Sequence, residues 1–370
     1  MRGASVTPTM PGVTPSLPTA LQRDVPLAPC TTLEVGGPAR FFVRAHDERA
    51  LADALAWADA EAIPVLLLGG GSNVLVADAG FPGLVLRASL PGRAARRVDG
   101  RARVTLGAGE AWDAAVAWTV AAGWGGVECL AGIPGRVGAA PIQNIGAYGQ
   151  EVGERVHSVR AWDRILRAVV ELDAAACGFG YRHSRFKAEP GRYVVLAVTL
   201  DLLPGAAGCA RYTQLAARLG DAPADLTATR AAVLALRREK SMVIEPADPN
   251  RRSAGSFFVN PVVPAATADA LAAGVGAPDM PRWAAPGGVK LSAAWLIQRA
   301  GMAPGFGEGP VGLSTRHTLA IVNRGAALAS EVVAFAGAVR RRVRAEFGVR
   351  LDPEPIFVGF DAPADALLDG

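Results

Sequence analysis

Two glycine-rich segments are the stretches of this 370-residue chain whose composition most clearly suggests chemistry. The first, Gly69-Gly70-Gly71-Ser72-Asn73, follows the apolar run Pro64–Leu68 and leads directly into a second apolar run, Val74–Val76. Consecutive glycines let backbone amides converge on an anion, because no Cβ blocks close approach or positive φ. A Rossmann turn would lead into a helix, whereas this loop runs from strand to strand. It is either a phosphate-binding segment or an ordinary tight turn.

The second segment, Cys129–Gly149, is dense in glycine and also contains two prolines. Such a segment loses much conformational entropy on ordering, so it is ordered only if something packs tightly on its backbone. Gln143, Asn144 and Tyr148 carry hydrogen-bonding groups of the kind that read the edge of a heterocycle. The alternative is a flexible linker. The regular spacing of its isoleucines and valines favours a ligand-binding loop.

Three shorter stretches carry charged or nucleophilic groups. In Phe179–Lys187 cationic side chains alternate with aromatic ones, which suits a carboxylate-binding arginine or merely a solvated turn. In Ser253–Pro261 the serine Ser256 lies in G-S-F and not in the G-x-S-x-G elbow of a hydrolase. No motif ties any of the four histidines to it, so a catalytic triad is unsupported. Glu354 lies between two prolines at the start of a predicted strand, where it is either functional or a loop carboxylate.

Composition bounds the remaining function classes. Hydrophobic residues make up 51% of the chain and charged residues 19%, as in a globular protein of two to three domains. The net charge of +4 suits an anionic ligand and does not require nucleic acid. Metal motifs and a Walker P-loop are absent, and no apolar run approaches the roughly 18 residues of a membrane span. The four cysteines are far apart and form no C-x-x-C pair, so we expect reduced thiols in a cytoplasmic protein.

Periodicity predicts alternating strands and helices in the first part of the chain and mixed elements near its end. The predicted strands are Phe41–Arg44, Pro64–Leu68, Val74–Val76, Leu84–Arg87, Arg103–Leu106, Val156–Trp162, Ile165–Leu172, Tyr193–Leu202 and Thr318–Asn323. The predicted helices follow Asp47, open at Glu110, run from about Thr227 to Lys240 and over Leu291–Ala300, and extend from Ser330 to a stop at Gly348. Residues 1–29 contain no signal-peptide pattern and are predicted to be a disordered lead-in.

Five of these segments together closely resemble the UDP-N-acetylenolpyruvoylglucosamine reductases, the MurB family of cell-wall synthesis. They are Leu68–Asn73, Ile133–Gly149, Tyr181–Lys187, Ala254–Pro261 and Leu351–Glu354. The resemblance covers roughly residues 30–360. The stretch Y-R-H-S-R-F-K and the later Tyr212 resemble the family class that closes a tyrosine-bearing loop over its substrate.

The resemblance implies an α+β fold: a two-subdomain FAD-binding fold of the PCMH/vanillyl-alcohol-oxidase type, followed by a C-terminal α+β substrate-binding domain. The expected domains are an FAD-binding subdomain at 30–92, a second at 93–242, a substrate-binding domain at 243–354 and a return to the FAD domain at 355–370. The FAD-binding region is expected at about 36–204.

It also implies site residues. Ser256, Arg182 and Glu354 are the expected catalytic residues, and Tyr212, Lys240, Asn260 and Lys290 the expected substrate-binding ones. The expected cofactor-binding residues are Gly69, Gly70, Gly71, Ser72, Asn73, Gly109, Ile133, Pro134, Gly138, Ala139, Gln143, Asn144, Gly146, Ala147, Tyr148 and Gly149. The resemblance implies no metal.

The implied reaction is an NADPH-dependent, FAD-mediated reduction of UDP-N-acetylglucosamine enolpyruvate to UDP-N-acetylmuramate for peptidoglycan. Hydride would pass from flavin N5 to C3 and a proton from Ser256 to C2, while Arg182 and a protonated Glu354 stabilise charge on the carboxylate. FAD is expected to be non-covalent, since Gly69–Val76 holds no His or Cys. We expect a cytoplasmic monomer that binds neither nucleic acid nor membrane.

Two other functions fit parts of the sequence. An oxidase on the same flavin architecture would keep the glycine loops but would not need Ala254–Pro261 or Leu351–Glu354. A nucleic-acid-binding module is suggested by Arg340-Arg341-Arg342 and Arg344, although arginines near a helix C-terminus are also favoured by the helix dipole.

Overall fold

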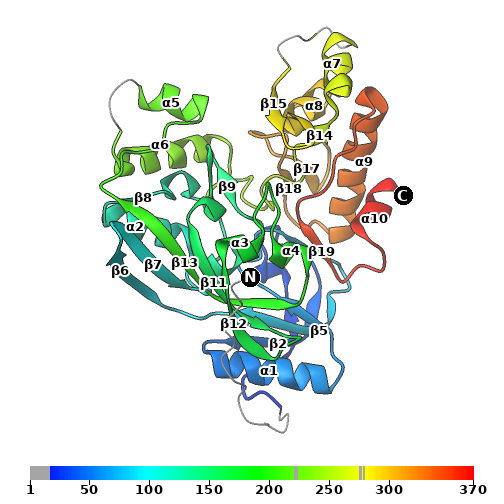
Figure 1. Cartoon of the computed structure of the whole chain (residues 1–370). Coiled ribbons are helices and arrows are strands. Elements are labelled where there is room, and N and C mark those ends of the chain that lie inside the picture. The colour runs from blue at the N-terminus through cyan, green and yellow to red at the C-terminus, as the bar shows by residue number, and fades with distance from the viewer. Residues whose placement is uncertain (1–16, 221–223, 275–276, 278–279) are drawn as a thin grey trace. The chain divides into compact units, whose positions relative to one another are not determined.

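The computed structural model describes residues 17–220, 224–274, 277 and 280–370 (Figure 1). These residues divide into two compact units. Unit 1 comprises 17–25, 39–70 and 82–243, and unit 2 comprises 26–38, 71–81 and 244–370. The loop Gly69–Asn73 therefore spans the point at which the chain leaves unit 1 and enters unit 2.

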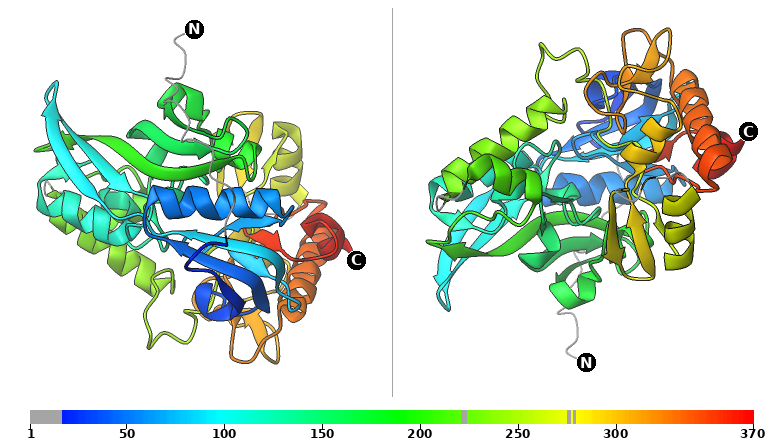
Figure 2. Two further views of the ribbon diagram at one scale, coloured as in Figure 1. Left: turned by 90° about the horizontal axis from the view of Figure 1, so that it is seen from below. Right: turned by 90° about the horizontal axis from the view of Figure 1, so that it is seen from above.

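The first sheet of unit 1 has four strands and one covering helix. Its order is β1-β2-β5-β3, with bounds Gln22–Pro26, Pro38–Ala45, Phe81–Ala88 and Val65–Leu67. Helix α1 (Glu48–Ala60) lies along one face of this sheet (Figure 2). Asp47 caps α1 by accepting a hydrogen bond of 2.7 Å from the Ala50 amide, as the sequence predicted. The buried face of the helix contains Leu51, Leu55 and Ala58.

The second sheet of unit 1 is antiparallel. Its order is β12-β11-β13-β7-β6, with bounds Ala168–Asp173, Val156–Asp163, Tyr193–Pro204, Arg101–Gly107 and Arg93–Val98; β8 (Trp124–Gly125) pairs with the end of β13. The side chains of β13 are buried in two cores. Val194 and Leu196 pack with α1, whereas Val195 and Val198 enter the larger core that includes α2 and α6. Successive side chains of a strand point to opposite faces, and the register shift of β13 against Arg160 and Ala161 interrupts this alternation, so that Val198 joins Val195.

The remaining elements of unit 1 are short, apart from two helices. The α-helices are α2 (Trp112–Ala121), α3 (Ala174–Cys177), α4 (Arg185–Ala188), α5 (Thr213–Leu219) and α6 (Leu226–Glu239). The glycine-dense segment and the residues that follow it contain only short elements. These are the 3-10 turns η2 (Glu128–Leu130), η3 (Val137–Ala139) and η4 (Val152–Glu154) and the two-residue strands β9 (Gly146–Ala147) and β10 (Gln150–Glu151).

Unit 2 has its own core, built around the 19-residue helix α9. Its helices are η1 (Ala28–Cys30), α7 (Ala265–Gly274), α8 (Ala293–Arg299), α9 (Ala329–Phe347) and α10 (Ala364–Asp369). Its strands form the sheet β14-β16-β15 (Val262–Val263, Gly288–Leu291, Arg282–Ala285), the pair β17–β18 (Val311–Leu313, Ile321–Asn323) and the parallel pair β19–β4 (Ile356–Val358, Val74–Val76). Gly348 ends α9 with φ of 65°, as predicted.

Most predicted elements are confirmed within one to three residues at their ends, and four predictions need correction. Ile165 and Leu166 belong to the β11–β12 turn and not to a strand, because both their amides donate to the Asp163 carboxylate. Residues 318–320 form a turn before β18, and Glu110 precedes α2. The predicted disordered lead-in is wrong over 22–26, where the chain adds edge strand β1 to the first sheet. The exposed, polar residues of β1 give no hydrophobic alternation that could reveal it. The part of this prediction over 1–16 lies outside the described residues.

The predicted mixture of helices and sheets is thus present in both units. No helix in the described ranges combines the length and apolar character needed to cross a bilayer.

Candidate active site

The two glycine-rich segments meet backbone to backbone in unit 1. A Cβ built on Gly70 would lie 2.6 Å from the Cα of Gly135, closer than side chains approach backbone. The loop enters this contact from β3, where the Leu68 amide donates to the Leu86 carbonyl at 3.0 Å. Gly70 is therefore required by proximity, and Gly135 has φ of 122°, a conformation that favours glycine.

Beyond this contact the loop offers unused hydrogen-bond donors. Among the described residues, the backbone N–H groups of Gly69 and Gly70 have no acceptor. Buried or half-buried amides normally find a partner, so this pair is suited to an anionic ligand. In unit 2 the same loop continues through Gly71, whose φ of +67° and contact with the Cys30 carbonyl exclude a side chain.

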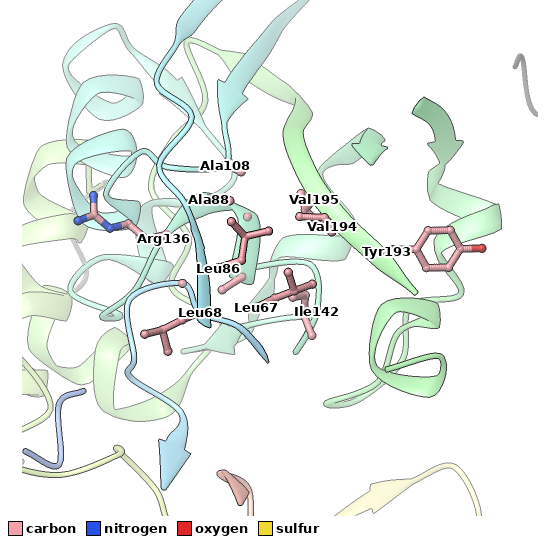
Figure 3. Close-up of a pocket in the computed structure, with 13 residues that line it drawn as sticks. Leu67, Leu68, Leu86, Ala88, Ala108, Arg136, Ile142, Tyr193, Val194 and Val195 are labelled. Carbon is pink, nitrogen blue, oxygen red and sulfur yellow. The ribbon is translucent and has the colours of Figure 1, made fainter. Parts of the chain in front are cut away.

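Next to these amides is a pocket with mostly apolar walls that is partly open to solvent. Its walls come from β3, β5, β13 and the 136–142 segment (Figure 3). Leu67, Leu86, Ile142 and Val195 are among the side chains that line it. At its edge the Arg136 guanidinium donates to the Gly109 carbonyl at 2.9 Å. Apolar walls with a few polar groups at the rim suit a planar aromatic ligand.

Gln143 supplies a further free donor in the second glycine-rich segment. Its side chain is 9% exposed, and its Oε1 accepts a hydrogen bond of 3.1 Å from Lys187. Its buried Nε2 has no partner within the described residues. An unsatisfied buried donor is costly, so Gln143 Nε2 is suited to an acceptor on a bound heterocycle.

Asn144, although predicted to contact the same ligand, is fully used inside the protein. Its Nδ2 donates to Glu151 at 2.8 Å and to the Gly180 carbonyl at 2.9 Å, and its Oδ1 accepts from the Gly153 amide at 2.9 Å. The bond to Gly180 ties the glycine-rich segment to the segment that precedes Arg182, and the other two bonds tie it to residues 151–153.

The other predicted cofactor-binding residues follow the same loops. Gly109, Gly138 and Ala139 lie beside or in the wall of the apolar pocket, with Gly138 donating to Ala108 at 2.9 Å. Ile133 packs on the core and Pro134 follows it before η3, while Gly146 and Ala147 form β9 and Gly149 turns into β10 with φ of +83°. Ser72 and Asn73 follow Gly71 in unit 2.

Arg182 is held against the second glycine-rich segment. It has φ of 51°, which a non-glycine residue rarely adopts. Its Nη2 donates to the Gly146 carbonyl at 3.0 Å, and its guanidinium lies 5.4 Å from the centre of the Tyr181 ring. Lys187 donates to the Arg182 carbonyl at 3.0 Å, which fixes the backbone of this turn. The guanidinium is thus preorganised beside a predicted cofactor-binding strand.

Tyr148, Tyr212 and Lys240, which are far apart in the sequence, form one cluster in unit 1. The two tyrosine rings meet edge to face with centres 5.4 Å apart, and Lys240 Nζ lies 5.9 Å from the Tyr148 ring. Lys240 also donates to Gln214 Oε1 at 2.9 Å. Burial lowers the pKa of Lys240, and the nearby positive charge of Arg237 acts in the same direction. Burial also raises the pKa of Tyr148.

Arg237 and Gln214 are polar members of this cluster that the sequence prediction missed. Arg237 donates to the Met242 carbonyl at 2.7 Å, whereas its buried Nε has no partner among the described residues. Burial also lowers the pKa of Arg237. Arg237 could have been found from its spacing, since it precedes Lys240 by three residues at the end of α6 and such positions share a helix face.

In unit 2 the two predicted catalytic segments lie side by side. The Glu354 amide donates to the Phe257 carbonyl at 2.9 Å, and Phe258 and Pro353 form an antiparallel bridge. The Glu354 carbonyl in turn accepts a hydrogen bond of 3.1 Å from Asn73 Nδ2. Ser256 is adjacent to Phe257, so its segment, Glu354 and the glycine loop are joined by backbone contacts.

A polar network anchors the chain that leads to Ser256. Arg251 and Arg252 both form ion pairs with Glu34, and the Ser253 carbonyl accepts a hydrogen bond of 2.6 Å from Thr32. Burial acts to raise the pKa of Glu34, but the hydrogen bonds from the two arginines outweigh it and lower the pKa. Gly255 then turns the chain with φ of +72°.

Asn260 and Lys290 lie near the small sheet of unit 2. Asn260 Oδ1 accepts a hydrogen bond of 2.9 Å from the Ala293 amide at the start of α8. Lys290 pairs with Val262 in the β14–β16 ladder, and its Nζ lies 5.8 Å from the Trp283 ring. Of the predicted catalytic and substrate-binding residues, Arg182, Tyr212 and Lys240 belong to unit 1, and Ser256, Glu354, Asn260 and Lys290 to unit 2.

Taken together, the free amides, the apolar pocket and the unsatisfied Gln143 donor fit a flavin dinucleotide. The amides suit its pyrophosphate, the apolar walls its rings and Gln143 a ring carbonyl or nitrogen.

Comparisons with known proteins agree with this arrangement. A family model for an FAD binding domain matches residues 39–165, and a model for the C-terminal domain of UDP-N-acetylenolpyruvoylglucosamine reductase matches residues 247–358. The predicted fold class, an FAD-binding α+β fold with a C-terminal α+β domain, is confirmed by these matches.

Curated relatives match almost the whole chain. The UDP-N-acetylenolpyruvoylglucosamine reductase of Nocardia farcinica is 49% identical over 349 residues, which cover 92% of this chain and 90% of that protein. The Streptomyces avermitilis protein of the same name is 46% identical over 350 residues, covering 92% and 95%. The crystal structure of the reductase MurB from Thermus caldophilus superposes with a TM-score of 0.62 at 27% identity, covering 91% and 98%.

Proposed function

The chain belongs to the family of UDP-N-acetylenolpyruvoylglucosamine reductases, as its motifs predicted, and we propose that it reduces UDP-N-acetylglucosamine enolpyruvate to UDP-N-acetylmuramate. It is therefore an FAD-dependent oxidoreductase, and NADPH is the proposed reductant. In the overall reaction, enolpyruvyl ether, NADPH and a proton give the lactyl ether and NADP⁺. The product is a precursor of peptidoglycan.

The observation that carries this proposal is the pairing of two segments in unit 2. The hydrogen bond between the Glu354 amide and the Phe257 carbonyl brings Ala254–Pro261 beside Leu351–Glu354. The rival oxidase reaction requires neither segment. Their pairing, anchored by Asn73 of the glycine loop, provides a hydroxyl and a carboxyl group on adjacent backbone.

FAD is proposed to be held by Gly69, Gly70, Gln143 and the apolar pocket, and when bound it supplies the hydride that reaches C3 of the enolpyruvyl group. An enol ether alone is a poor hydride acceptor, and its conjugated carboxylate makes C3 electrophilic. Negative charge then develops on C2 and the carboxylate, and a preorganised cation or donor there lowers the barrier.

We assign the stabilisation of that charge to Arg182 and Glu354. The Arg182 guanidinium is oriented by its bond to the Gly146 carbonyl, so little reorganisation is required on binding a carboxylate. Glu354 acts in its protonated form as a hydrogen-bond donor. Ser256 delivers the proton to C2, a role open to a weak acid only because the developing centre is strongly basic.

The diphosphate of the nucleotide sugar is assigned to Tyr212, Lys240, Asn260 and Lys290. Lys240 and Tyr212 already share a cluster with Tyr148, which supports a common role. We propose that residues 30–92 and 93–242 hold FAD and that residues 243–354 bind the substrate. We also propose that residues 355–370 return to the FAD domain, where β19 pairs with β4. We further propose that the protein is a monomer that acts in the cytoplasm.

The direct test is an anaerobic absorbance experiment on the FAD-loaded protein. NADPH should bleach the visible absorption band of the oxidised flavin. Subsequent mixing with UDP-N-acetylglucosamine enolpyruvate should restore the band with formation of one product per flavin. Reoxidation that requires oxygen and yields hydrogen peroxide, with no response to the nucleotide sugar, would instead identify an oxidase.

A further inference from the structure

Two of the four cysteines lie against each other in unit 1, at a place that the proposed reaction does not use. The Cys129 thiol, in η2, donates a hydrogen bond of 3.5 Å to the carbonyl oxygen of Cys209. That oxygen is only two bonds from the Cα of Cys209, so the Cys129 sulfur approaches the backbone from which the second thiol projects. Disulfides need Cα atoms about 4.4–6.8 Å apart. The side chains of Cys129 and Cys209 are also within hydrogen-bond reach of each other.

The approach is fixed by backbone contacts as well as by the thiol. The Cys209 amide donates to Glu128 Oε1 at 3.2 Å, and Glu128 immediately precedes Cys129. Glu128 also accepts hydrogen bonds from the Gly126 amide at 2.6 Å and from Gln150 at 2.8 Å. Since Glu128 is buried and held by three donors, the chain at Cys209 is tied to η2 whatever rotamer its thiol adopts.

The two thiols differ in accessibility. Cys129 is 0% exposed, and burial holds the pKa of its thiol above the ordinary range, so it is unreactive by itself. Cys209 is half-buried and lines a pocket of about 750 Å³ together with Glu154, Arg155 and Arg211. A small oxidant can therefore reach Cys209 from the pocket, whereas it cannot reach the buried Cys129 directly.

We propose that Cys129 and Cys209 form a reversible disulfide when the protein meets a hydroperoxide. Hydrogen peroxide oxidises the Cys209 thiolate to sulfenic acid and releases hydroxide. The Cys129 thiol then attacks the Cys209 sulfur, the S–O bond breaks and water leaves. In total, two thiols and one peroxide give one disulfide and two waters.

The disulfide acts on the segment that carries Tyr212, a consequence that rests on the proposed function. Cys209 precedes Tyr212 by three residues, and Tyr212 packs on Tyr148 beside Lys240. A covalent link from Cys209 to η2 restrains this segment, so binding of the nucleotide sugar weakens. The proposed function gives Tyr212 no role in the reduction of the flavin by NADPH, so that half-reaction should be unaffected.

The first test is chemical and is independent of activity. The FAD-loaded protein, freed of reductant, is treated with a few equivalents of hydrogen peroxide, denatured in iodoacetamide and digested without reduction. Mass spectrometry should find a Cys129–Cys209 cross-linked peptide, and thiol titration should fall from four thiols to two. Dithiothreitol should restore all four thiols.

Three variants control this experiment. Cys209→Ser and Cys129→Ala should each abolish the cross-link, and alanine avoids burying an unpaired hydroxyl at 129. Cys30→Ser is the matched control, because Cys30 is also half-buried but its thiol faces the Pro26 carbonyl. That variant should form the cross-link as the wild type does.

The second test measures steady-state kinetics before and after peroxide. We expect the KM for the nucleotide sugar to rise about threefold or more in the oxidised protein, as restraint of a contact segment predicts. The rate of flavin reduction by NADPH should not change, and Cys209→Ser should be insensitive to peroxide.

Several results would overturn the disulfide: four thiols that survive peroxide, a cross-link to another cysteine, or oxidation of Cys209 to sulfinic acid without a cross-link. A cross-link that forms normally in a protein without reductase activity would uphold the disulfide and refute the proposed function instead.

Discussion

Ser256 is the residue whose role can be separated most cleanly from cofactor binding. It lies beside the Phe257–Glu354 contact in unit 2, and Gly255 before it adopts φ of +72°. The proposed role of Ser256 begins only once charge develops on the substrate. Its removal should therefore affect one half of the catalytic cycle.

We expect Ser256→Ala to reduce turnover by about 10²–10⁴-fold, the usual worth of a positioned general acid. Flavin reduction by NADPH should remain within about twofold of wild type. Stopped-flow absorbance measures both half-reactions. Ser253→Ala on the same loop is the control and should retain most of the turnover. It keeps the backbone carbonyl that binds Thr32 and removes only the 3.4 Å hydrogen bond that the Ser253 hydroxyl accepts from the Gly255 amide. Equal loss of both half-reactions in Ser256→Ala would remove Ser256 from its role.

Because the pKa of Lys240 is lowered, we expect substrate binding to depend on pH. Burial and the charge of Arg237 hold its pKa below the ordinary 10.5. The Lys240 ammonium therefore loses its proton at a lower pH than an exposed lysine does. Since the charged form binds the diphosphate, the KM for the nucleotide sugar should increase as the pH rises, before it reaches the ordinary lysine pKa of about 10.4.

Lys240→Arg tests this assignment, because a guanidinium stays charged throughout that range. Its KM should depend less on pH, although its value can be higher because Arg fits a lysine site imperfectly. A wild-type KM that is independent of pH, measured alongside an unchanged kcat, would exclude Lys240 from diphosphate binding.

At the scale of elements, the close contact of the two glycine segments makes Gly70 the most sensitive position. A Cβ there would lie 2.6 Å from the Gly135 Cα, so Gly70→Ala must push the segments apart. We expect the Kd for FAD, measured by titration of the apoprotein, to rise about tenfold or more. Gly274→Ala, in α7 with open space around its Cα, should bind FAD normally. Circular dichroism verifies that both variants fold; wild-type affinity in Gly70→Ala would contradict the contact.

Asp78 couples two elements of unit 2 by capping α9 from another part of the chain. Its carboxylate accepts hydrogen bonds from the Ala329 amide at 2.6 Å and the Ser330 amide at 3.0 Å. We expect Asp78→Ala to lower the free energy of unfolding by about 1 kcal/mol, as loss of an N-cap usually does. Urea denaturation at neutral pH measures the difference.

The effect should also depend on pH. Burial acts to raise the pKa of Asp78, but the bonds from Ser330 and Ala329 outweigh it and bring the pKa below 3.8. A carboxyl group whose pKa is lower in the folded protein than in the unfolded chain stabilises the fold fully at pH values above the unfolded-state pKa. This stabilisation is lost as the pH falls through the folded-state pKa. The difference between wild type and Asp78→Ala should therefore shrink in acid. Asp269→Ala, which breaks the ion pair of an exposed carboxylate with Arg282, should cost clearly less at neutral pH.

At the scale of the whole molecule, the purified protein should be yellow with one releasable FAD per chain. No His or Cys occurs in Gly69–Val76, and Cys129 and Cys177 are fully buried. Precipitation with trichloroacetic acid should leave the flavin in the supernatant, where absorbance and chromatography identify it as FAD. Colour that remains in the pellet would show covalent attachment.

The alternative function of nucleic-acid binding was suggested by the arginines at 340–344 in α9. Arg340 is fully buried and forms ion pairs of 3.0 Å with Asp365 and 3.3 Å with Asp369. A side chain committed in this way joins α9 to α10 and is not available to bind phosphate. Arg340, the first arginine of the basic run at 340–344, therefore has a structural explanation.

The sequence by itself determined the local elements, because their signals are local. The cap at Asp47, the stop at Gly348 and the strand-to-strand glycine loop each depend on residues within a few positions. The family also followed from the sequence, since five motifs in fixed order carry more information than any one of them.

Only the tertiary structure decided which of the motif side chains remain free for a ligand. Gln143 and Asn144 are adjacent in sequence but differ in their contacts. The side-chain amide of Asn144 donates hydrogen bonds to Glu151 and to the Gly180 carbonyl, whereas the buried Nε2 of Gln143 has no partner among the described residues. Contacts such as Asn73 with Glu354, or Cys129 with Cys209, join residues far apart along the chain. Hydrogen bonds of this kind depend on where the backbone passes after folding, and no periodicity in the sequence encodes them.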